Sequence, residues 1–317
     1  MKNILVTGGA GFIGSNFIHH MLKCNSAVHI INLDALTYAG DLANLDNLPD
    51  PSRYTFVEGN ICREHELACT VHQYSIDTIV HFAAETHVDN SISGPKRFMR
   101  TNIMGTFALL EQARKHNIRF HHVSTDEVYG SLSPLEQSWT ENSPYAPNSP
   151  YSASKASSDH LVRAYGHTYG LKYTITNCSN NYGPRQHPEK LIPMTITNSL
   201  NSKPTPVYGD GKQVRDWIYV EDHCEAIHLV LEKGKMGEAY NIGAGNQPTN
   251  IEIISAIHRI LKPDKPLICY VEDRLGHDRR YAINASKIRI KLGWYPKVSL
   301  EKGLINSVNW YMERAKK

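Results

Sequence analysis

The chain has 317 residues, 41% of them hydrophobic, which is enough for a real core in one large domain or two smaller ones. Its 34 basic residues nearly balance its 31 acidic ones and are scattered along the chain, so we expect no nucleic-acid partner. The first apolar run is too short for a signal peptide, and none approaches the ~20 residues of a membrane span.

Six cysteines without a Cys-x-x-Cys pair are typical of reduced thiols. We therefore expect a cytoplasmic protein without a membrane partner.

In the first half of the chain, apolar strands alternate with amphipathic helices. Helices are predicted at residues 12–23 and 95–116. Strands are predicted at residues 3–8, 28–34, 54–60, 77–84 and 119–125. Continuous apolar strands separated by helices indicate a parallel sheet that is covered on both faces. The predicted fold class is α/β, a doubly wound parallel sheet of the Rossmann type.

The pattern changes after about residue 180, where turn-rich stretches such as NNYGP (180–184) and YGDGK (208–212) interrupt it. Further helices are predicted at residues 250–261 and 300–315. We predict a nucleotide-binding region over residues 1–180, with late strands added from about 210–245. The rest, residues 181–317, is predicted to be a smaller α+β region over the C-terminal edge of the sheet.

A glycine loop follows the first predicted strand and opens the first helix. Gly8, Gly11 and Gly14 have the spacing G-x-x-G-x-x-G, which permits a tight turn and close approach of the backbone to a pyrophosphate. The N–H groups at the start of the helix then face the phosphates. Asp34 ends the second strand about 20 residues on, where an acid would hold the ribose hydroxyls. The alternative is a simple glycine turn.

The residues after Asp34 favour NAD over NADP. Ala35 and Leu36 follow it, and neither is an arginine that would take a 2′-phosphate. Asn60 follows the third strand and would hydrogen-bond the adenine edge, although a surface turn is nearly as good an interpretation. Small alanines in HFAAET (81–86) would let a dinucleotide lie across the strand ends, but they also fit ordinary core packing.

Tyr151 and Lys155 lie at i and i+4 on a predicted helix, hence on one face. A tyrosine with an ordinary pKa of about 10 is a poor base near neutrality. A lysine cation one turn away, together with a nicotinamide cation, would favour the phenolate. An exposed helix pair is the alternative, and the preceding glycine loop argues against it.

Long strings in this sequence carry a resemblance to a known family. They include TGGAGFIG, HFAAETHVDNSI, STDEVYG, SPYSASKASSDHLVRAY, TNCSNNYGP and RDWIYVEDH. From Met1 to about Tyr311, the chain resembles the extended short-chain dehydrogenase/reductases of the NAD-dependent epimerase/dehydratase family. Within that family it is most similar to the 4,6-dehydratases of nucleotide sugars. The resemblance implies a lyase with NAD as cofactor and dTDP-glucose as substrate.

The resemblance also implies a reaction and residue roles. Hydride leaves sugar C4 for NAD while Tyr151 takes the O4 proton, water leaves across C5 and C6, and hydride returns to C6. Glu127 would remove the C5 proton and Asp126 would protonate the departing C6 oxygen, because adjacent carboxyl groups in different environments can divide such labour. Thr125 would hydrogen-bond O4. Without the resemblance, a turn cap at Asp126 and a solvated Glu127 are the simpler hypothesis.

The remaining site residues follow from the resemblance. At the cofactor it places Gly8, Gly11, Phe12, Ile13, Gly14, Asp34, Leu36, Asn60, Ile61, Phe82, Ala83, Ala84, Thr101, Tyr151, Lys155 and Asn181. At the substrate it places Thr86, His87, Thr125, Asn180, Lys190, Leu191, Pro206, Val207, Tyr208, Arg215, Asn250, Asp273, Arg274 and His277. An arginine fork such as that of Arg215 suits a diphosphate.

Several alternatives stay open. They are a UDP-glucose 4,6-dehydratase, a nucleotide-sugar 4-epimerase or decarboxylase, and a non-catalytic sensor of NAD or a sugar nucleotide. The acid pair Asp126–Glu127 argues against the epimerases, and the decarboxylases carry a serine at the place of Asp126. Where the family has an acid, this chain has Asn60, and its loops after Leu36 and Ile260 are short. The pathway that uses the product, dTDP-rhamnose or another deoxysugar, is left open.

The resemblance implies a homodimer, formed by the helices from Pro95 to His116 and from Tyr151 to Tyr169. Its candidate apolar contacts are Phe107, Leu110, Leu161 and Val162. We predict no metal site, because the side chains of the adjacent pairs His19–His20 and His121–His122 diverge on a helix or a strand.

Overall fold

The computed structural model describes residues 1–263, 265 and 267–316. Its centre is a seven-stranded sheet with the order β10-β6-β5-β4-β1-β2-β3, in which every neighbouring pair is parallel. The strands are β1 (Asn3–Thr7), β2 (His29–Asp34), β3 (Tyr54–Glu58), β4 (Thr78–His81), β5 (Arg119–Thr125), β6 (Tyr173–Cys178) and β10 (Glu238–Ile242). The predicted fold class is confirmed.

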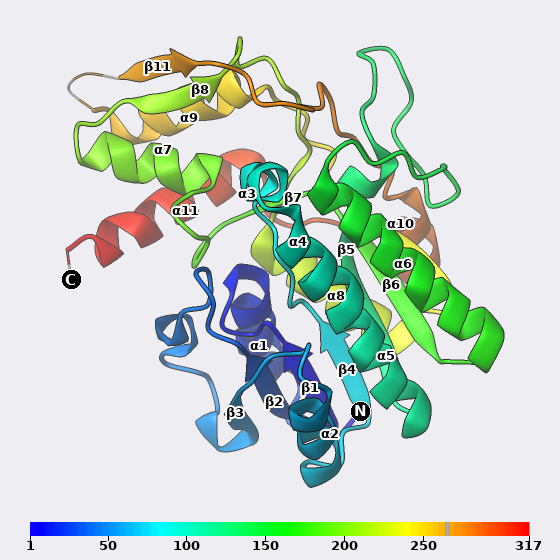
Figure 1. Cartoon of the computed structure of the whole chain (residues 1–317). Helices are drawn as coiled ribbons and strands as arrows, with labels where there is room; N and C mark the ends of the chain where they lie inside the picture. Colours follow the sequence, from blue (N-terminus) through cyan, green and yellow to red (C-terminus); the bar gives the residue numbers. More distant parts are fainter. Residues whose placement is uncertain (264, 266, 317) are drawn as a thin grey trace.

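Helices cover both faces of this sheet (Figure 1). One face carries α1 (Phe12–Cys24), α8 (Val220–Lys233) and α10 (Ser286–Leu292), and the other carries α2 (Glu64–Gln73), α5 (Thr106–Lys115) and α6 (Pro150–Tyr169). Successive strand residues serve opposite faces: Ile4 packs toward α1 and α8, whereas Leu5 packs toward α2 and α5. Because both faces are buried, the strands are continuous apolar runs.

The prediction of one regular helix from Pro95 to His116 is wrong. It consists of α4 (Pro95–Phe98), a π-helical segment (Met99–Gly105) and α5, preceded by the separate helix α3 (Val88–Ser93). The side chain of Asn102 accepts from the backbone N–H of Glu85 at 2.9 Å and donates to its carbonyl at 3.0 Å. This link to the loop after β4 lies within the widened turns, and such turns are frequent at functional sites.

The later part of the chain forms a smaller layer above one end of the sheet (Figure 1). It contains α7 (Leu191–Leu200), β8 (Thr205–Tyr208), α9 (Asn250–Leu261), β11 (Ile268–Val271) and α11 (Leu300–Arg314). Ile196, Ile253 and Leu304 lie in its own apolar core. The strand pair β7 (Asn180–Tyr182) and β9 (Trp217–Tyr219) joins this layer to the sheet, while β10 returns to pair with β6. The division of the chain at residue 180 stays a prediction.

Short 3-10 turns complete the fold at η1 (Leu42–Leu45), η2 (Pro51–Arg53) and η4 (Asp126–Tyr129). Among the described residues, no helix is both long enough and apolar enough to cross a membrane.

Candidate active site

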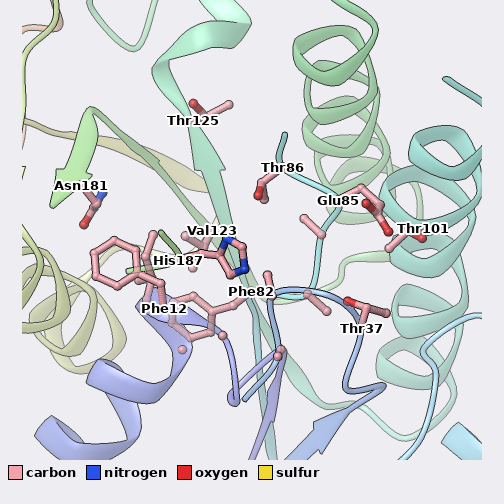
Figure 2. Close-up of a pocket in the computed structure, with 18 of the residues that line it drawn as sticks. Phe12, Thr37, Phe82, Glu85, Thr86, Thr101, Val123, Thr125, Asn181 and His187 are labelled. Atoms are coloured by element: carbon pink, nitrogen blue, oxygen red, sulfur yellow. The ribbon is translucent and has the colours of Figure 1, made fainter. Parts of the chain in front are cut away.

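A cavity of about 320 Å³ opens at the carboxyl ends of the strands, where β1 and β4 lie side by side and the strand order reverses. Open α/β sheets bind their ligands at this switch point. Figure 2 shows its lining: Phe12 and Asn181 lie on one side, Glu85 and Thr101 on the other, and Thr125 lies at the end of β5.

The glycine loop forms the floor of the cavity. Gly8 has a φ of +73°, and a Cβ there would lie 2.7 Å from the backbone of Ala83. A Cβ on Gly14 would lie 2.3 Å from the carbonyl oxygen of Gly8. Both positions therefore exclude side chains, whereas a Cβ on Gly11 would meet only that carbonyl, at 3.3 Å. The backbone and the start of α1 are left accessible to a ligand, as a pyrophosphate requires.

Asp34, at the end of β2, ties this floor together. Its carboxylate accepts from the backbone N–H of Ala10 at 2.8 Å and from that of Leu36 at 2.9 Å. Burial raises the pKa of Asp34, and the backbone donors work against the rise. Each oxygen keeps a lone pair for a ribose hydroxyl. The acceptor oxygens of Asp34 thus fit the ribose of a dinucleotide without a 2′-phosphate.

The predicted cofactor residues converge on the cavity, with one exception. Leu36 does not line it and instead caps Asp34 through its backbone. The lining includes Gly8, Gly11, Phe12, Ile13, Gly14, Asp34, Asn60, Ile61, Phe82, Ala83, Ala84, Thr101, Tyr151, Lys155 and Asn181. One lone pair of the Asn60 side-chain oxygen is already used, because it accepts from the backbone N–H of Cys62 at 2.9 Å.

The two acids follow β5 directly, in the 3-10 turn η4. Thr125 caps this turn by accepting from the backbone N–H of Glu127 at 3.3 Å, and its hydroxyl donates to Asp126 Oδ1 at 3.4 Å. Thr125, both acids, Tyr151 and Lys155 all line the same cavity. The strand end therefore projects the carboxyl groups to the place where a substrate would meet the cofactor.

Asp126 and Glu127 lie in different electrostatic surroundings. Burial raises the pKa of Asp126 well above its ordinary value, and the neighbouring carboxylates of Glu127 and Asp216 raise it further. Burial also raises the pKa of Glu127, but the cations Arg274, Arg215 and Lys190 oppose that rise. The surroundings thus raise the pKa of Asp126 more strongly than that of Glu127.

Tyr151 and Lys155 lie one turn apart on α6, and both are buried. Burial raises the pKa of Tyr151 well above 10, and Glu127 raises it further, whereas a hydrogen bond with Thr125 lowers it. Lys155 Nζ donates to the carbonyl oxygen of Val123 at 2.9 Å and lies 3.4 Å from His122 Nε2. The surroundings alone thus favour the neutral phenol, so its deprotonation needs added positive charge.

The predicted substrate residues divide into two groups. Thr86, Thr125, Asn180 and Lys190 line the cavity. The others lie outside its lining: His87, Leu191, Pro206, Val207, Tyr208, Arg215, Asn250, Asp273, Arg274 and His277. The cavity does not bring the second group together with the first.

Several of these residues form an outer cluster, made of Tyr208, Asp273, Arg274 and His277. Arg274 lies over the Tyr208 ring at 5.9 Å, and His277 Nδ1 lies 2.5 Å from Asp273 Oδ1. Tyr208 donates to Asp89 of α3 at 3.3 Å, which links the cluster to the sheet region. Arg274 opposes the rise in the pKa of Glu127, so the cluster bears electrostatically on the acid pair.

Arg215 is held beneath the outer cluster. Its guanidinium lies 4.2 Å from the centre of the Tyr281 ring and donates to the carbonyl oxygen of Asp278 at 2.9 Å. Burial lowers its pKa, and Glu127 is among the groups that raise it. The charge of Arg215 therefore acts on both acids of the pair.

Some cavity residues escaped the sequence predictions. Glu189 lies beside Lys190 at 3.6 Å and accepts from Tyr38 at 3.3 Å, so it links two loops at the cavity. In the sequence, Glu189 is indicated only by its position directly before Lys190, a predicted substrate residue. Cys178, at the end of β6, also lines the cavity, and burial raises its pKa to about 12.

In the part of the chain that the structure describes, no group of three or more His, Cys, Asp and Glu residues could hold a metal ion. The adjacent histidines have separate partners. His121 contacts Thr174 and Thr176 within the sheet, whereas His122 faces Lys155 and Asp159.

A doubly wound sheet whose switch-point cavity combines a glycine loop, an acid at the end of β2 and a Tyr–Lys pair defines a class: the extended short-chain dehydrogenase/reductases. The profile of the GDP-mannose 4,6 dehydratase family matches residues 5–306. The chain belongs to this family, which agrees with the resemblance seen in its motifs.

Characterised relatives narrow the comparison. A dTDP-glucose 4,6-dehydratase from Neisseria gonorrhoeae is 51% identical over 98% of this chain and 96% of its own length. The solved dTDP-glucose 4,6-dehydratase from Bacillus anthracis, in complex with NAD, has a TM-score of 0.92 and 50% identity, covering 100% of this chain and 98% of its own. That from Streptomyces venezuelae, with NAD and TYD bound, has a TM-score of 0.94 and 49% identity, covering 99% and 98%.

Proposed function

We propose that this chain is an NAD-dependent hydro-lyase that converts dTDP-glucose to dTDP-4-keto-6-deoxyglucose and water. This proposal rests on one observation: Asp126 and Glu127 line the same cavity as Tyr151, Lys155 and the glycine loop. That cavity holds the groups for a redox step and for an elimination. The identity of about 50% with dTDP-glucose 4,6-dehydratases over nearly the whole chain supports this function.

The glycine loop and Asp34 would hold NAD, which when bound would supply the hydride chemistry from sugar C4 to C6. Tyr151 takes the O4 proton, because its phenol and the Thr125 hydroxyl are neighbours at the end of β5. Lys155 supplies positive charge behind the tyrosine, which favours the phenolate that this step requires. Thr125 and Tyr151, which line the same cavity, would meet the sugar.

The acid pair performs the elimination. Glu127, whose charge the cations Arg274, Arg215 and Lys190 favour, removes the proton at C5 and gives a proton back to C5 when hydride reaches C6. Asp126, whose proton is held by burial and two neighbouring carboxylates, protonates the C6 oxygen as it leaves. Two carboxyl groups with separated pKa values are the usual solution to this task.

We place the diphosphate between Asn180 and Arg215 and the nucleoside against the outer cluster. Arg215 is buried, so binding a diphosphate desolvates little further charge on the protein side. Lys190 comes from the loop before α7 and lines the cavity below this position.

Incubating the purified protein with dTDP-glucose and, separately, with UDP-glucose tests the proposal. A 4-keto-6-deoxy sugar, detected by NMR or mass spectrometry, is expected from dTDP-glucose in preference to UDP-glucose. Formation of a C4 epimer instead would contradict the elimination, and equal rates with both nucleotides would contradict the choice of thymidine.

We propose that NAD stays bound through turnover, because hydride leaves and returns within one cycle. The NAD content of the purified protein, measured after denaturation, tests this. Protein that prefers NADP, or that needs added cofactor for every cycle, would contradict it.

We also propose a cytoplasmic homodimer. The exposed side chains of Met104 and Tyr169 and the half-buried ones of Phe107 and Leu161 lie on the two helical segments that the resemblance assigned to the interface. Leu110 and Val162, named with them, are fully buried in this chain's own core and are not free to contact a partner.

A further inference from the structure

The ammonium of Lys155 is buried without a carboxylate beside it. Its side chain is only 4% exposed. Its hydrogen-bond partners are the carbonyl oxygen of Val123, at 2.9 Å, and His122 Nε2, at 3.4 Å. Among the described residues, no ion pair within 4.0 Å includes this lysine. A buried cation needs compensation, since otherwise it loses its proton.

The compensating anion lies on the far side of His122. The same Nε2 atom that faces Lys155 lies 3.3 Å from Oδ1 of Asp159. The carboxylate and the ammonium are therefore less than about 7 Å apart, since both contact one atom. Asp159 is fully buried, and its second oxygen accepts from Tyr145 at 2.8 Å and from Asn177 at 3.1 Å.

His122 lies between the two charges and is itself neutral. Burial and the charge of Lys155 lower its pKa to about 4, against the opposing effect of Asp159. Its Nδ1 has no hydrogen-bond partner among the described residues. Its Nε2 either accepts from Lys155 or donates to Asp159, so the carboxylate acts on the ammonium by its charge, across the ring.

We propose that Asp159 is a positioning residue for the catalytic pair: acting through His122, its carboxylate keeps Lys155 protonated and holds it against β5, one turn from Tyr151. This deepens the proposed function and rests on it. His122 lies on β5 and Asp159 lies on α6, and neither residue lines the cavity.

The surroundings single out Asp159. Among the described residues, the other titratable groups that act on this cluster include His81 of β4, His121 of β5, Cys178 of β6, and Tyr145 and Arg163. None of them is a carboxylate. Burial lowers the pKa of Lys155, and Asp159 is the first of the groups that raise it. Without the charge of Asp159, the largest effect that opposes the lowering of the pKa of Lys155 by burial is lost.

The reaction requires a lasting charge on Lys155. The O4 proton passes to Tyr151, and the product is a ketone that does not take it back. Tyr151 must therefore lose this proton in each turnover and become a phenolate again, while Asp126, which gives a proton to the leaving oxygen, regains one, so that no net proton is released. Because the surroundings of Tyr151 raise its pKa, the ammonium of Lys155 has to persist through the cycle for this loss to occur.

The first test measures Lys155 directly and needs no substrate. The Nζ resonance in ¹⁵N-lysine-labelled protein, assigned by its loss in Lys155→Met, is followed against pH in the wild type and in Asp159→Asn. We expect the pKa of Lys155 to fall by about one unit or more in the variant. An unchanged pKa would overturn the proposal, whatever reaction the protein catalyses.

The second test measures the rate of NAD reduction against pH. Without Asp159, Lys155 loses its charge at a lower pH, so the alkaline limb of the profile moves toward acid in Asp159→Asn. At pH values above the new limb, the rate of NAD reduction in the variant should be about 10-fold below that of the wild type for each pH unit by which the limb moves. A merely structural loss would instead lower the rate by one factor at every pH, and that result would contradict the inference.

His122 offers a matched pair of variants. In His122→Gln, the amide oxygen can accept from Lys155 while the amide N–H donates to Asp159, so the alkaline limb should stay near its wild-type pH. In His122→Leu, Lys155 loses its polar partner on β5, and the limb should move toward acid. Equal behaviour of the two variants would argue against a role of His122.

Tyr145→Phe controls for simple loss of packing. It removes a neutral hydrogen bond to the same carboxylate and leaves every charge in place, so its limb should not move. Melting temperatures of all variants separate loss of folding from loss of charge. If the wild type fails to convert dTDP-glucose, the proposed function fails, while the lysine titration still decides the inference.

Discussion

Asp126 and Glu127 are neighbours in the chain, yet their carboxyl groups are exposed to opposite kinds of charge. Asp126 is influenced by two carboxylates and one arginine, whereas Glu127 is influenced by three cations and one carboxylate. This difference arises because the turn η4 directs one side chain toward Asp216 and the other toward Arg274 and Lys190. Their division into acid and base is therefore a consequence of position rather than of residue type.

Replacing Asp126 tests the acid. Asp126→Asn should still allow hydride transfer from C4, so NADH should accumulate while elimination lags. General acid catalysis contributes roughly 10²–10⁴-fold, and turnover should fall within that range. A 6-fluoro sugar, whose leaving group needs no proton, should recover much of the lost rate. Loss of the first hydride transfer in this variant would show that Asp126 acts earlier.

Replacing Glu127 tests the base. Glu127→Gln should stop exchange of the C5 proton with solvent deuterium, because the group that removes this proton is gone. A better leaving group should not help, since the defect precedes departure of the C6 oxygen. NMR of the recovered sugar measures the exchange. Rescue of Glu127→Gln by the 6-fluoro substrate, without rescue of Asp126→Asn, would reverse the assigned roles.

Asp216 predicts a pH dependence of stability. Its Oδ1 accepts from the backbone N–H groups of Gly245 and Asn246, and burial raises its pKa to about 7. A raised carboxyl pKa contributes stability below the unfolded value, near 4, and that stability is lost as pH rises through 7. Asp216→Asn keeps an acceptor and has no charge. The melting temperature of this variant, relative to that of the wild type, should therefore rise between pH 5 and pH 8.

Asp210 provides the control for that titration. It is exposed and paired with Arg279 at 2.8 Å, which holds its pKa at about 2. In Asp210→Asn, the difference in melting temperature from the wild type should be constant from pH 5 to pH 8. A constant difference in Asp216→Asn as well would mean that Asp216 is ionised throughout this range.

At the scale of elements, the side chains of the site are positioned by short irregular segments that join the regular strands and helices. The glycine loop joins β1 to α1, the turn η4 ends β5, and the π-helical segment Met99–Gly105 places Thr101 at the cavity. Each is tied by specific contacts, as when Asn102 donates to and accepts from the backbone of Glu85. The regular sheet supplies rigidity, and these segments supply the positions of the side chains.

The loop between β1 and α1 is sensitive to a single methyl group. In Gly14→Ala, the new Cβ would lie 2.3 Å from the Gly8 carbonyl, so the loop or the helix must shift. Strain of about 1–3 kcal/mol corresponds to roughly 5- to 150-fold weaker NAD binding, which calorimetry on cofactor-free protein would measure. In Gly94→Ala, the nearest atom is 3.6 Å away, and affinity should be unchanged. Unaltered affinity in Gly14→Ala would mean that the loop does not bind the cofactor.

At the scale of the whole molecule, the later layer lies above one end of the sheet (Figure 1), and residues of both parts line the cavity. The floor comes from the first strands and their loops, and Lys190 and the outer cluster come from the later residues. The contact from Tyr208 to Asp89 joins the two parts directly. The candidate site is therefore built from residues of both parts of the chain.

The proposed dimer makes a prediction at this scale. Met104 is 54% exposed in the single chain, so Met104→Glu should leave its fold intact. A buried, unpaired carboxylate at the interface should weaken the dimer at least ~10-fold, as measured by sedimentation. Tyr270→Glu, on β11 and 61% exposed, lies away from these helices and should remain dimeric. Monomeric wild-type protein at micromolar concentration would contradict the proposal.

Local spacing in the sequence was sufficient for the parallel sheet, the glycine loop with Asp34, and the pairing of Tyr151 with Lys155 on one helix face. These features depend on residues close in the chain, where the periods of strands and helices fix which side chains share a face. The resemblance added the acid pair and its chemistry, because the motifs around it are long and specific.

Only the tertiary structure decided which distant residues meet. It placed His122 and Asp159 behind Lys155, and it buried Leu110 and Val162 in the chain's own core. It also separated the outer cluster from the lining of the cavity, although the motifs had grouped both as substrate contacts. These outcomes depend on how helices and sheet pack across long separations in the chain, and burial and electrostatic environment are set there rather than by local sequence.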